Sequence, residues 1–224
     1  MLTVHHLERS RSHRILWLLE ELAIEYKLEI YQRDPKTMRA PPSLRALHPL
    51  GKAPLVTVDG LVLAESGAIL EHLVERFGEG RLRPAAGSPE AVQYRYWLHY
   101  AEGSLMPPLL VRLITETLKK APAPFFIRPL VRAIAGKIDA GFTSAELAAH
   151  SGFIEEALAK QPWFAGAAFS AADVQMSYPV MALVEGGRGG GAAMPNASAW
   201  LARIKARPAY QAAELRGGPN GSPG

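Results

Sequence analysis

The chain has 224 residues, which is enough for one large hydrophobic core or two modest ones. Hydrophobic residues make up 48% of it and charged residues 21%, the composition of an ordinary globular protein. The formal net charge of +4 is spread along the chain without a basic block, so it favours small anionic ligands and argues against a nucleic-acid partner.

Two absences in the sequence narrow the function further. No apolar run approaches the roughly 18 residues of a membrane span, and no secretory signal is visible before the first strand, so we expect a cytoplasmic protein with no membrane partner. The chain contains no cysteine, which excludes disulfides, thiolate metal sites and cysteine nucleophiles. Any thiol chemistry must therefore use a thiol that a ligand carries.

The first part of the chain alternates between predicted strands and predicted helices. Leu2–Leu7 and Tyr26–Gln32 have the alternation of strands that can pair in parallel. Between them, the leucine and isoleucine side chains of His13–Ala23 cover one wide face of a helix. After a proline-bearing loop, Ser43–Leu47 is at most a short helix.

Residues 51–66 predict a turn, a hairpin and the start of a helix. Pro54 follows a Gly-Lys-Ala turn, where a cis peptide bond costs little. Asp59-Gly60 joins two short apolar runs and is typical of a tight two-residue hairpin. Ser66 is the expected N-cap of a helix over Gly67–Phe77, and the free N–H groups there can bind a carboxylate. The order β-α-β-α-β-β-α suits a mixed four-stranded sheet with helices on its faces.

The later part of the chain predicts helices and no strand. We expect a first domain over residues 1–78, a glycine- and proline-rich linker over 79–89 and an all-α domain over 90–216. The predicted helical regions are Glu90–Lys120 with a kink or break at Pro107-Pro108, one or two helices in Phe125–His150, then Ser151–Lys160, a helix from a capping box at Ser170 and Asp173 to about Leu183, and Asn196–Ala206. Residues 217–224 have the composition of a disordered tail.

Taken together, these features resemble the glutathione transferase family. The turn before Pro54, the hairpin, Glu65-Ser66 and the following helix are similar to the glutathione-binding half of its thioredoxin-like domain. The run of residues 162–166, Pro-Trp-Phe-Ala-Gly, and the box at Ser170 and Asp173 are similar to its helical domain. The resemblance covers nearly the whole chain, and the N-terminal sequence most resembles bacterial and fungal members of the family. It implies a homodimeric detoxification enzyme that binds glutathione and conjugates its thiolate to small hydrophobic electrophiles.

The resemblance also implies a role for each residue of the predicted glutathione site. Ala53, which precedes Pro54, would hold the cysteinyl part of glutathione with its backbone. Glu65 and Ser66 would hold the γ-glutamyl end, and Lys52 would meet the glycyl carboxylate. The family more often has valine or isoleucine where this chain has Ala53, a change that keeps the backbone contact. The alternative for these residues is an ordinary hairpin followed by an ordinary helix.

The thiol of glutathione needs a donor that favours its ionised form. One hydroxyl, together with a helix N-terminus aimed at the sulfur, lowers the thiol pKa. Ser10 stands four residues before Arg14, the offset found in serine-type members of the family, so Ser10 is the expected donor. Ser12 is the alternative, although its position is better suited to capping the helix. A backbone N–H group, or no side-chain donor at all, is the third possibility.

The electrophile would bind against the first long helix of the second domain. Tyr94, Trp97, Tyr100 and Met106 lie there at roughly helical spacing. Stripes of this kind usually pack in a core or between domains, but the same region lines the electrophile pocket in this family. Tyr100 and Met106 are therefore the candidate pocket residues.

No metal is expected to take part. His5 and His6 are adjacent in a predicted strand and point to opposite faces, so they cannot ligate one ion from one side, and His13 is then isolated.

Two other functions remain open. One is the glutathione-dependent reduction of disulfides or peroxides, which the sequence does not separate well from conjugation. The other is ligand binding without turnover on the same fold. The intact Lys52, Ala53-Pro54 and Glu65-Ser66 argue against the second, because a purely structural descendant could lose them freely. The absence of cysteine sets aside the classes that form a protein mixed disulfide with glutathione.

Overall fold

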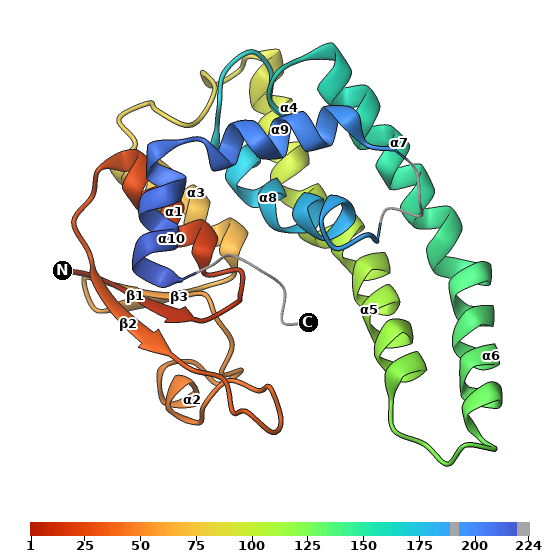
Figure 1. The fold of residues 1–224 in the computed structure, drawn as a ribbon. Helices are drawn as coiled ribbons and strands as arrows, with labels where there is room; N and C mark the ends of the chain where they lie inside the picture. The colour runs from red at the N-terminus through yellow and green to blue at the C-terminus, as the bar shows by residue number, and fades with distance from the viewer. Residues whose placement is uncertain (189–192, 219–224) are drawn as a thin grey trace.

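The computed structural model describes residues 1–188 and 193–218, and its first part is a four-stranded sheet with helices packed on it (Figure 1). The strand order is β2-β1-β3-β4; β1 pairs parallel with β2 and antiparallel with β3, which in turn pairs antiparallel with β4. The strands are β1 (Leu2–Leu7), β2 (Lys27–Tyr31), β3 (Leu55–Val58) and β4 (Leu61–Ala64). The predicted mixed sheet, with its first two strands in parallel, is confirmed.

Helices connect the strands and make up the rest of the described chain. They are α1 (His13–Leu22), α2 (Ser43–Leu47), α3 (Ser66–Phe77), α4 (Pro89–Tyr100), the π-helical turn η1 (Ala101–Leu105), α5 (Met106–Lys120), α6 (Arg128–Ile138), the π-helical turn η2 (Asp139–Thr143), α7 (Ser144–Lys160), α8 (Ala171–Val184), α9 (Pro195–Lys205) and α10 (Pro208–Gly217). The predicted class, an α/β part followed by an all-α part, is therefore confirmed. None of these helices combines the length and the apolar character that a membrane crossing requires, within the residues that the structure describes.

The hairpin forms as its turn sequence predicts. Asp59 has a φ of 48° and Gly60 a φ of 82°, so both turn residues are in the left-handed region. A two-residue turn of this kind matches the right-handed twist of the flanking strands. Val58 and Leu61 are consequently paired directly across it.

Helix α1 lies at the centre of the molecule and is buried almost all round. Ile15 and Leu19 are completely covered, and so is Arg14. This burial arises because α3, α8 and α10 all pack against α1 (Figure 1). A helix with neighbours on several sides loses the usual division into one apolar and one polar face.

The sequence did not predict α10, which returns from the end of the chain to pack on α1 (Figure 1). Tyr210 and Ala213 are fully buried in this contact. Gly217 is the last residue of the helix, so the expectation of a tail beginning at residue 217 is wrong there. Residues 219–224 of that expected tail lie outside the described residues.

Two helix boundaries also differ from the predictions. Pro107 and Pro108 fall in the first turn of α5, where the missing N–H groups cost little, and the π-helical turn η1 precedes them. The expected break therefore takes the form of a local change in helical hydrogen bonding. Further along, α7 is continuous over Ser144–Lys160, so the boundary predicted at Ser151 is wrong.

The predicted capping box begins α8. Ser170 and Asp173 make both reciprocal hydrogen bonds of the motif. The Asp173 carboxylate is fully buried and also accepts from the backbone N–H of Phe164 at 3.0 Å and from the indole N–H of Trp200 at 3.1 Å. Burial raises the pKa of Asp173 to about 6 despite these donors. This side chain thus joins α8, α9 and the loop before α8.

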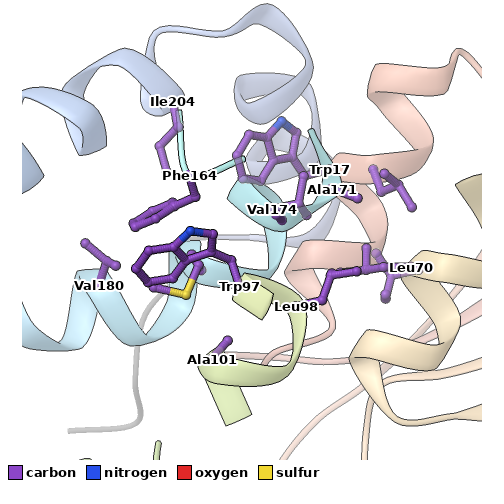
Figure 2. Close-up of a cluster of buried hydrophobic side chains, with 14 of the residues drawn as sticks. Trp17, Leu70, Trp97, Leu98, Ala101, Phe164, Ala171, Val174, Val180 and Ile204 are labelled. Carbon is purple, nitrogen blue, oxygen red and sulfur yellow. The ribbon is translucent and has the colours of Figure 1, made fainter. Parts of the chain in front are cut away.

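A single hydrophobic core runs through both parts of the chain. Figure 2 shows Trp17 of α1 and Leu70 of α3 in the same cluster as Leu98 of α4 and Val174 of α8. The division into two domains with a linker over residues 79–89 stays a prediction. The continuous core implies that the two parts are packed together rather than loosely tethered.

Candidate active site

A buried arginine collects polar side chains from three other elements. One terminal nitrogen of Arg14, Nη1, donates to Glu102 Oε1 at 2.6 Å, to Gln175 Oε1 at 3.2 Å and to Ser66 Oγ at 3.4 Å. Ser66 begins α3, Glu102 belongs to η1 and Gln175 to α8. Arg14 on α1 therefore links the start of α3, a predicted glutathione-binding position, to the helical part of the protein.

The charges in this cluster depend on one another. Burial lowers the pKa of Arg14, and the neighbouring carboxylate of Glu102 opposes that effect. Burial would by itself raise the pKa of Glu102, but Arg14 and Arg11 together hold it below its usual value. Arg11 Nε lies 3.4 Å from the same carboxylate oxygen. The cluster is thus an ion pair that both partners need, because either charge alone would be costly to bury.

Two donors of Arg14 are left over. Nε and Nη2 are buried and have no hydrogen-bond partner among the residues that the structure describes. The guanidinium carbon lies 5.4 Å from the ring centroid of Tyr178, which offers a cation–π contact. Arg11 lies at the same distance from that ring. Unpaired buried donors of a guanidinium are rare, so these two nitrogens set Arg14 apart from an ordinary structural arginine.

Ser10 and Ser12 lie in the loop between β1 and α1 with their hydroxyl oxygens 2.7 Å apart. Ser10 keeps 7% of its surface exposed, whereas Ser12 is completely covered. The Ser12 hydroxyl is turned towards β1, where it lies 3.2 Å from the Leu7 N–H and 2.9 Å from His6 Nδ1. The backbone of Ser12 occupies the N-cap position of α1, but its side chain makes no capping bond. The predicted capping role of that hydroxyl is therefore wrong.

Of the predicted glutathione-binding residues, Glu65 and Ser66 form the start of α3, and Pro54 directly precedes β3, whose Leu55 pairs with Ala64. The Ala53–Pro54 peptide bond is cis, with Ala53 half-buried and Pro54 buried. Lys52 and Glu65 are exposed, whereas Ser66 is buried. The N-cap of α3 is Glu65, with a φ of 70°, and Ser66 is the first helical residue. The prediction that Ser66 is the N-cap is wrong by one position, because the left-handed backbone turn occurs at Glu65.

Side chains of α8 lie over the start of α3. A Cβ atom added to Gly67 would lie 3.5 Å from Nε2 of Gln175. That distance is an ordinary van der Waals contact, so Gln175 of α8 lies directly against the first turn of α3. The helical part of the protein consequently forms one wall of the region in which Ser66 lies.

The two candidate pocket residues lie in different surroundings. Tyr100 is buried against Trp97 and Phe153, and its hydroxyl contacts His150 on α7. Burial raises the pKa of this phenol. Met106 is half-buried beside the core. The surroundings of Tyr100 favour the packing alternative, and the role of either residue in an electrophile pocket stays a prediction.

The adjacent histidines of β1 do point to opposite faces. His5 lies 3.1 Å from the Tyr31 hydroxyl and 2.9 Å from the Thr57 hydroxyl, whereas His6 faces Ser12 and α10. In residues 1–188 and 193–218, no group of three His, Asp or Glu side chains is arranged to hold a metal ion.

Sequence reasoning missed three members of the cluster around Arg14: Glu102, Gln175 and Tyr178. The sequence distinguished Arg14 only by its spacing from Ser10. Each missed residue comes from a helix far along the chain, and no local motif distinguishes it. The one available signal was Gln175, a polar side chain within the largely buried α8.

Comparison with known proteins shows the family to which the chain is similar. The profile of the glutathione S-transferase N-terminal domain matches residues 1–75, and that of the C-terminal domain matches residues 126–208. Glutathione S-transferase 3 of Schizosaccharomyces pombe is 40% identical over 182 residues, covering 81% of this chain and 74% of its own length. Glutathione S-transferase 1 of Saccharomyces cerevisiae is 34% identical over 229 residues, 99% of this chain and 97% of its own.

Among solved structures, a glutathione S-transferase from Actinobacillus pleuropneumoniae has a TM-score of 0.78 and 32% sequence identity, covering 98% of this chain and 94% of its own. The fold and these similarities define a transferase. The chain belongs to the glutathione S-transferase family.

Proposed function

We propose that this protein binds glutathione at the start of α3, stabilises its thiolate beside Ser10 and conjugates it to a small hydrophobic electrophile. The observation that carries this proposal is the buried Arg14, which joins Ser66 to Glu102 and Gln175. Arg14 follows Ser10 by four residues at the start of α1, so one short segment serves both the thiol and the γ-glutamyl end of the ligand. The names of the related proteins, glutathione S-transferases, support the same substrate.

The ligand's charges suit the residues around α3. The γ-glutamyl end carries an ammonium group and a carboxylate. Glu65 and Glu102 supply negative charge for the first, while Ser66 and the first N–H groups of α3 supply donors for the second. The cysteinyl part would meet the backbone of Ala53 beside Pro54. Lys52, which is exposed, is available to the glycyl carboxylate.

The chemical step needs little from the protein beyond a stabilised thiolate. A hydroxyl donor at Ser10 favours the charged sulfur over the neutral thiol, which lowers the thiol pKa. The thiolate lone pair then forms a bond to an electrophilic carbon, and the leaving group departs with its bonding electrons. Holding both reactants together supplies the remaining rate enhancement. Tyr100 and Met106 are retained as candidates for the electrophile side.

We also propose a homodimer in the cytoplasm. The feature that supports the dimer is a set of exposed apolar side chains on α5, the following loop, α6 and η2, a hairpin that extends from the body of the molecule (Figure 1). Its exposed side chains are Leu110, Ile114, Leu118, Phe125, Phe126, Ile127, Leu130, Ile134, Ile138 and Phe142. A patch of this size on a monomer would be unusual, and a second copy of the chain would bury it.

The proposed function is tested by turnover and by glutathione retention. The protein should be retained on immobilised glutathione and should conjugate a generic aryl halide. Turnover of a hydroperoxide or a disulfide without turnover of the halide would favour the reductase alternative. Retention without any turnover would favour a ligand-binding protein, and neither retention nor turnover would overturn the proposal.

Two variants locate the site within that experiment. Glu65→Ala and Ser66→Ala should each raise the glutathione KM about tenfold to a hundredfold with a smaller effect on kcat. The reason is that each removes a charge-assisted contact of roughly 1.5–3 kcal/mol made equally in the ground and transition states. Glu75→Ala, an exposed change further along α3, is the matched control and should leave KM unchanged. An unchanged KM in both site variants would contradict this placement.

A further inference from the structure

A chain of hydrogen bonds leads from Ser10 into the interior of the protein. Ser10 Oγ lies 2.7 Å from Ser12 Oγ, which lies 2.9 Å from Nδ1 of His6. The other ring nitrogen, Nε2, lies 2.8 Å from the backbone carbonyl oxygen of Gly217. His6 is 1% exposed. The chain therefore connects the expected thiol donor on the loop to the end of α10 through one buried imidazole.

The partners decide which nitrogen of His6 carries the proton. The Gly217 carbonyl can only accept, so Nε2 is the protonated nitrogen. In the neutral ring Nδ1 is then an acceptor and takes the hydroxyl proton of Ser12 at 2.9 Å, a shorter contact than the 3.2 Å between that hydroxyl and the Leu7 carbonyl oxygen. The remaining proton of the serine pair belongs to Ser10 and points inward, towards Ser12 Oγ. Ser10 Oγ also accepts from the backbone N–H of Ser12 at 3.2 Å, so it presents one lone pair, and no proton, to any group outside.

The inner end of this hydrogen-bond chain, where His6 meets α10, is tightly packed. A Cβ atom added to Gly217 would lie 3.1 Å from Nε2 of His6 and 2.4 Å from Cδ1 of Leu16. Glycine is thus required for the last turn of α10 to bring a carbonyl against the ring.

We propose that His6 accepts the thiol proton of bound glutathione through Ser10 and Ser12, and that its charge turns Ser10 into a donor to the resulting thiolate. This inference rests on the proposed function, because it requires glutathione with its sulfur beside Ser10. His6 touches no substrate; it is a positioning residue that acts through the two hydroxyls.

The proton movement balances along the chain. The thiol proton passes to Ser10 Oγ, the Ser10 proton to Ser12 Oγ and the Ser12 proton to Nδ1 of His6. The products are a thiolate and an imidazolium, with each serine neutral as before. In this state Nδ1 donates to Ser12, Ser12 donates to Ser10 and Ser10 donates to sulfur, while Nε2 keeps its bond to Gly217. Each serine hydroxyl now donates its hydrogen bond outward instead of inward, and no buried donor is left unpaired.

Some groups around His6 lower its pKa and others raise it. Burial lowers the pKa of His6, whereas the Gly217 carbonyl on α10 and the carboxylate of Glu8 on the same loop raise it. His13 on α1 is close enough for the two rings to repel when both are charged, but burial keeps His13 neutral. His6 is therefore neutral in the free protein near pH 7. A negatively charged sulfur at Ser10 is the additional charge that would favour the imidazolium.

Nuclear magnetic resonance of the His6 ring nitrogens tests the proposal directly. At neutral pH, saturating glutathione should convert His6 from the neutral ring to the imidazolium. S-methylglutathione occupies the same site without a thiol proton and should leave the ring neutral. Thiolate absorbance in the ultraviolet with His6 still neutral would overturn the proposal and leave the proposed function standing. A protein that binds neither ligand would overturn both.

Two substitutions of His6 distinguish the proposed proton transfer from a purely structural role of this residue. The amide oxygen of Asn reproduces the acceptor at Nδ1 but cannot be protonated, so His6→Asn locks the Ser12 proton inward. His6→Gln reproduces the donor to Gly217 and leaves Ser12 free to donate to Ser10. The apparent pKa of the bound thiol should rise by about one unit or more, a tenfold lower thiolate fraction, in His6→Asn and by less in His6→Gln. Equal shifts, or the reverse order, in two folded variants would overturn the proposal.

Discussion

Ser10 and Ser12 are two positions apart, and their hydroxyls face different surroundings. Ser10 retains a small exposed surface, whereas Ser12 is covered and faces Leu7 and His6. The loop thus places one hydroxyl at the surface and uses the other to anchor it. This arrangement favours Ser10 as the donor to sulfur and leaves Ser12 as its support.

Mutation can distinguish the roles of Ser10 and Ser12. Ser10→Ala should raise the apparent pKa of bound glutathione by about one to two units with little change in affinity, because a hydrogen bond to a charged sulfur is worth about 1.5–3 kcal/mol. Ser12→Ala should shift the same titration by breaking the chain. It should also lower the free energy of unfolding by about 1–3 kcal/mol, since it leaves the buried Leu7 N–H unpaired.

Thiolate absorbance against pH and urea unfolding of both variants supply the measurements. If Ser12→Ala moves the titration and Ser10→Ala does not, the donor is Ser12. If neither moves it, backbone N–H groups hold the sulfur.

His13, the first residue of α1, predicts a pH dependence of stability. Its ring is buried against Tyr210, both ring nitrogens lack a hydrogen-bond partner among the described residues, and burial lowers its pKa to about 3. An unfolded histidine has a pKa of about 6.5, so below that pH the unfolded chain binds the additional proton. The free energy of unfolding should therefore fall by up to about 1.4 kcal/mol per pH unit as the pH drops from 6.5 towards 3.

Asp173 opposes this trend, so the measurement must be a difference. Its pKa is raised to about 6, and its contribution to stability accordingly grows as the pH falls through that value. Subtracting the unfolding free energy of His13→Phe from that of the original protein at each pH cancels the Asp173 contribution. A difference that does not vary between pH 7 and 5 would show that His13 is solvated or already paired.

At the scale of secondary structure, the start of α8 is held by more than a helix cap. Asp173 accepts from the N–H groups of Ser170 and Phe164 and from the indole of Trp200 on α9. Asp173→Ala would leave these buried donors unpaired and should lower the free energy of unfolding by about 3 kcal/mol or more. Urea unfolding with an unchanged slope provides the measurement.

Ser170→Ala is the matched control for that prediction. It removes the capping hydroxyl of the same helix but keeps the carboxylate, so it should cost only about 1 kcal/mol. Equal losses in the two variants would mean that the bonds to Phe164 and Trp200 contribute nothing beyond the cap.

The π-helical turn η1 shows a second effect at this scale. Glu102 lies in this turn, next to α5 with its Pro107-Pro108 pair. Proline removes an N–H group and crowds the preceding turn, which favours a local change of hydrogen bonding. We infer that the proline pair helps to place Glu102 against Arg14. The π-helical turn η1 accommodates the prolines and also carries Glu102.

At the scale of the whole molecule, the core that crosses both parts of the chain and the exposed face of α5 and α6 have different consequences. The shared core keeps α8 and η1 against the start of α3, so the site around Arg14 is fixed in one body. The exposed face remains for another partner.

The dimer prediction is tested by sedimentation equilibrium at micromolar concentration. The mass should be twice the 24.3 kDa of the chain. Ile134→Glu, in the middle of the α6 stripe, should weaken the dimer by tenfold or more, because a charge would be buried without a partner. Leu215→Glu is the control: Leu215 is also exposed, but it lies on α10, away from α6 (Figure 1). A monomer in the original protein, or equal effects of the two changes, would contradict the prediction.

Local signals in the sequence determined the hairpin, the capping box and the order of strands and helices. Asp59-Gly60 specifies a turn through its backbone preferences, and Ser170 with Asp173 caps a helix through contacts three residues apart. Such interactions need no other part of the chain, so one-dimensional patterns predict them. The parallel pairing of β1 with β2 followed similarly from the helix between them.

Only the tertiary structure decided what surrounds Arg14 and His6. The partners of Arg14 are 52, 88 and 161 residues away in the chain, and Gly217 is 211 residues from His6. The helix α10 carries no strong pattern of its own and is held by its contact with α1. Burial and charge at these positions depend on which helices pack together, a property that no local stretch of sequence contains. For the same reason the sequence predicted the serine of the thiol loop without the imidazole behind it.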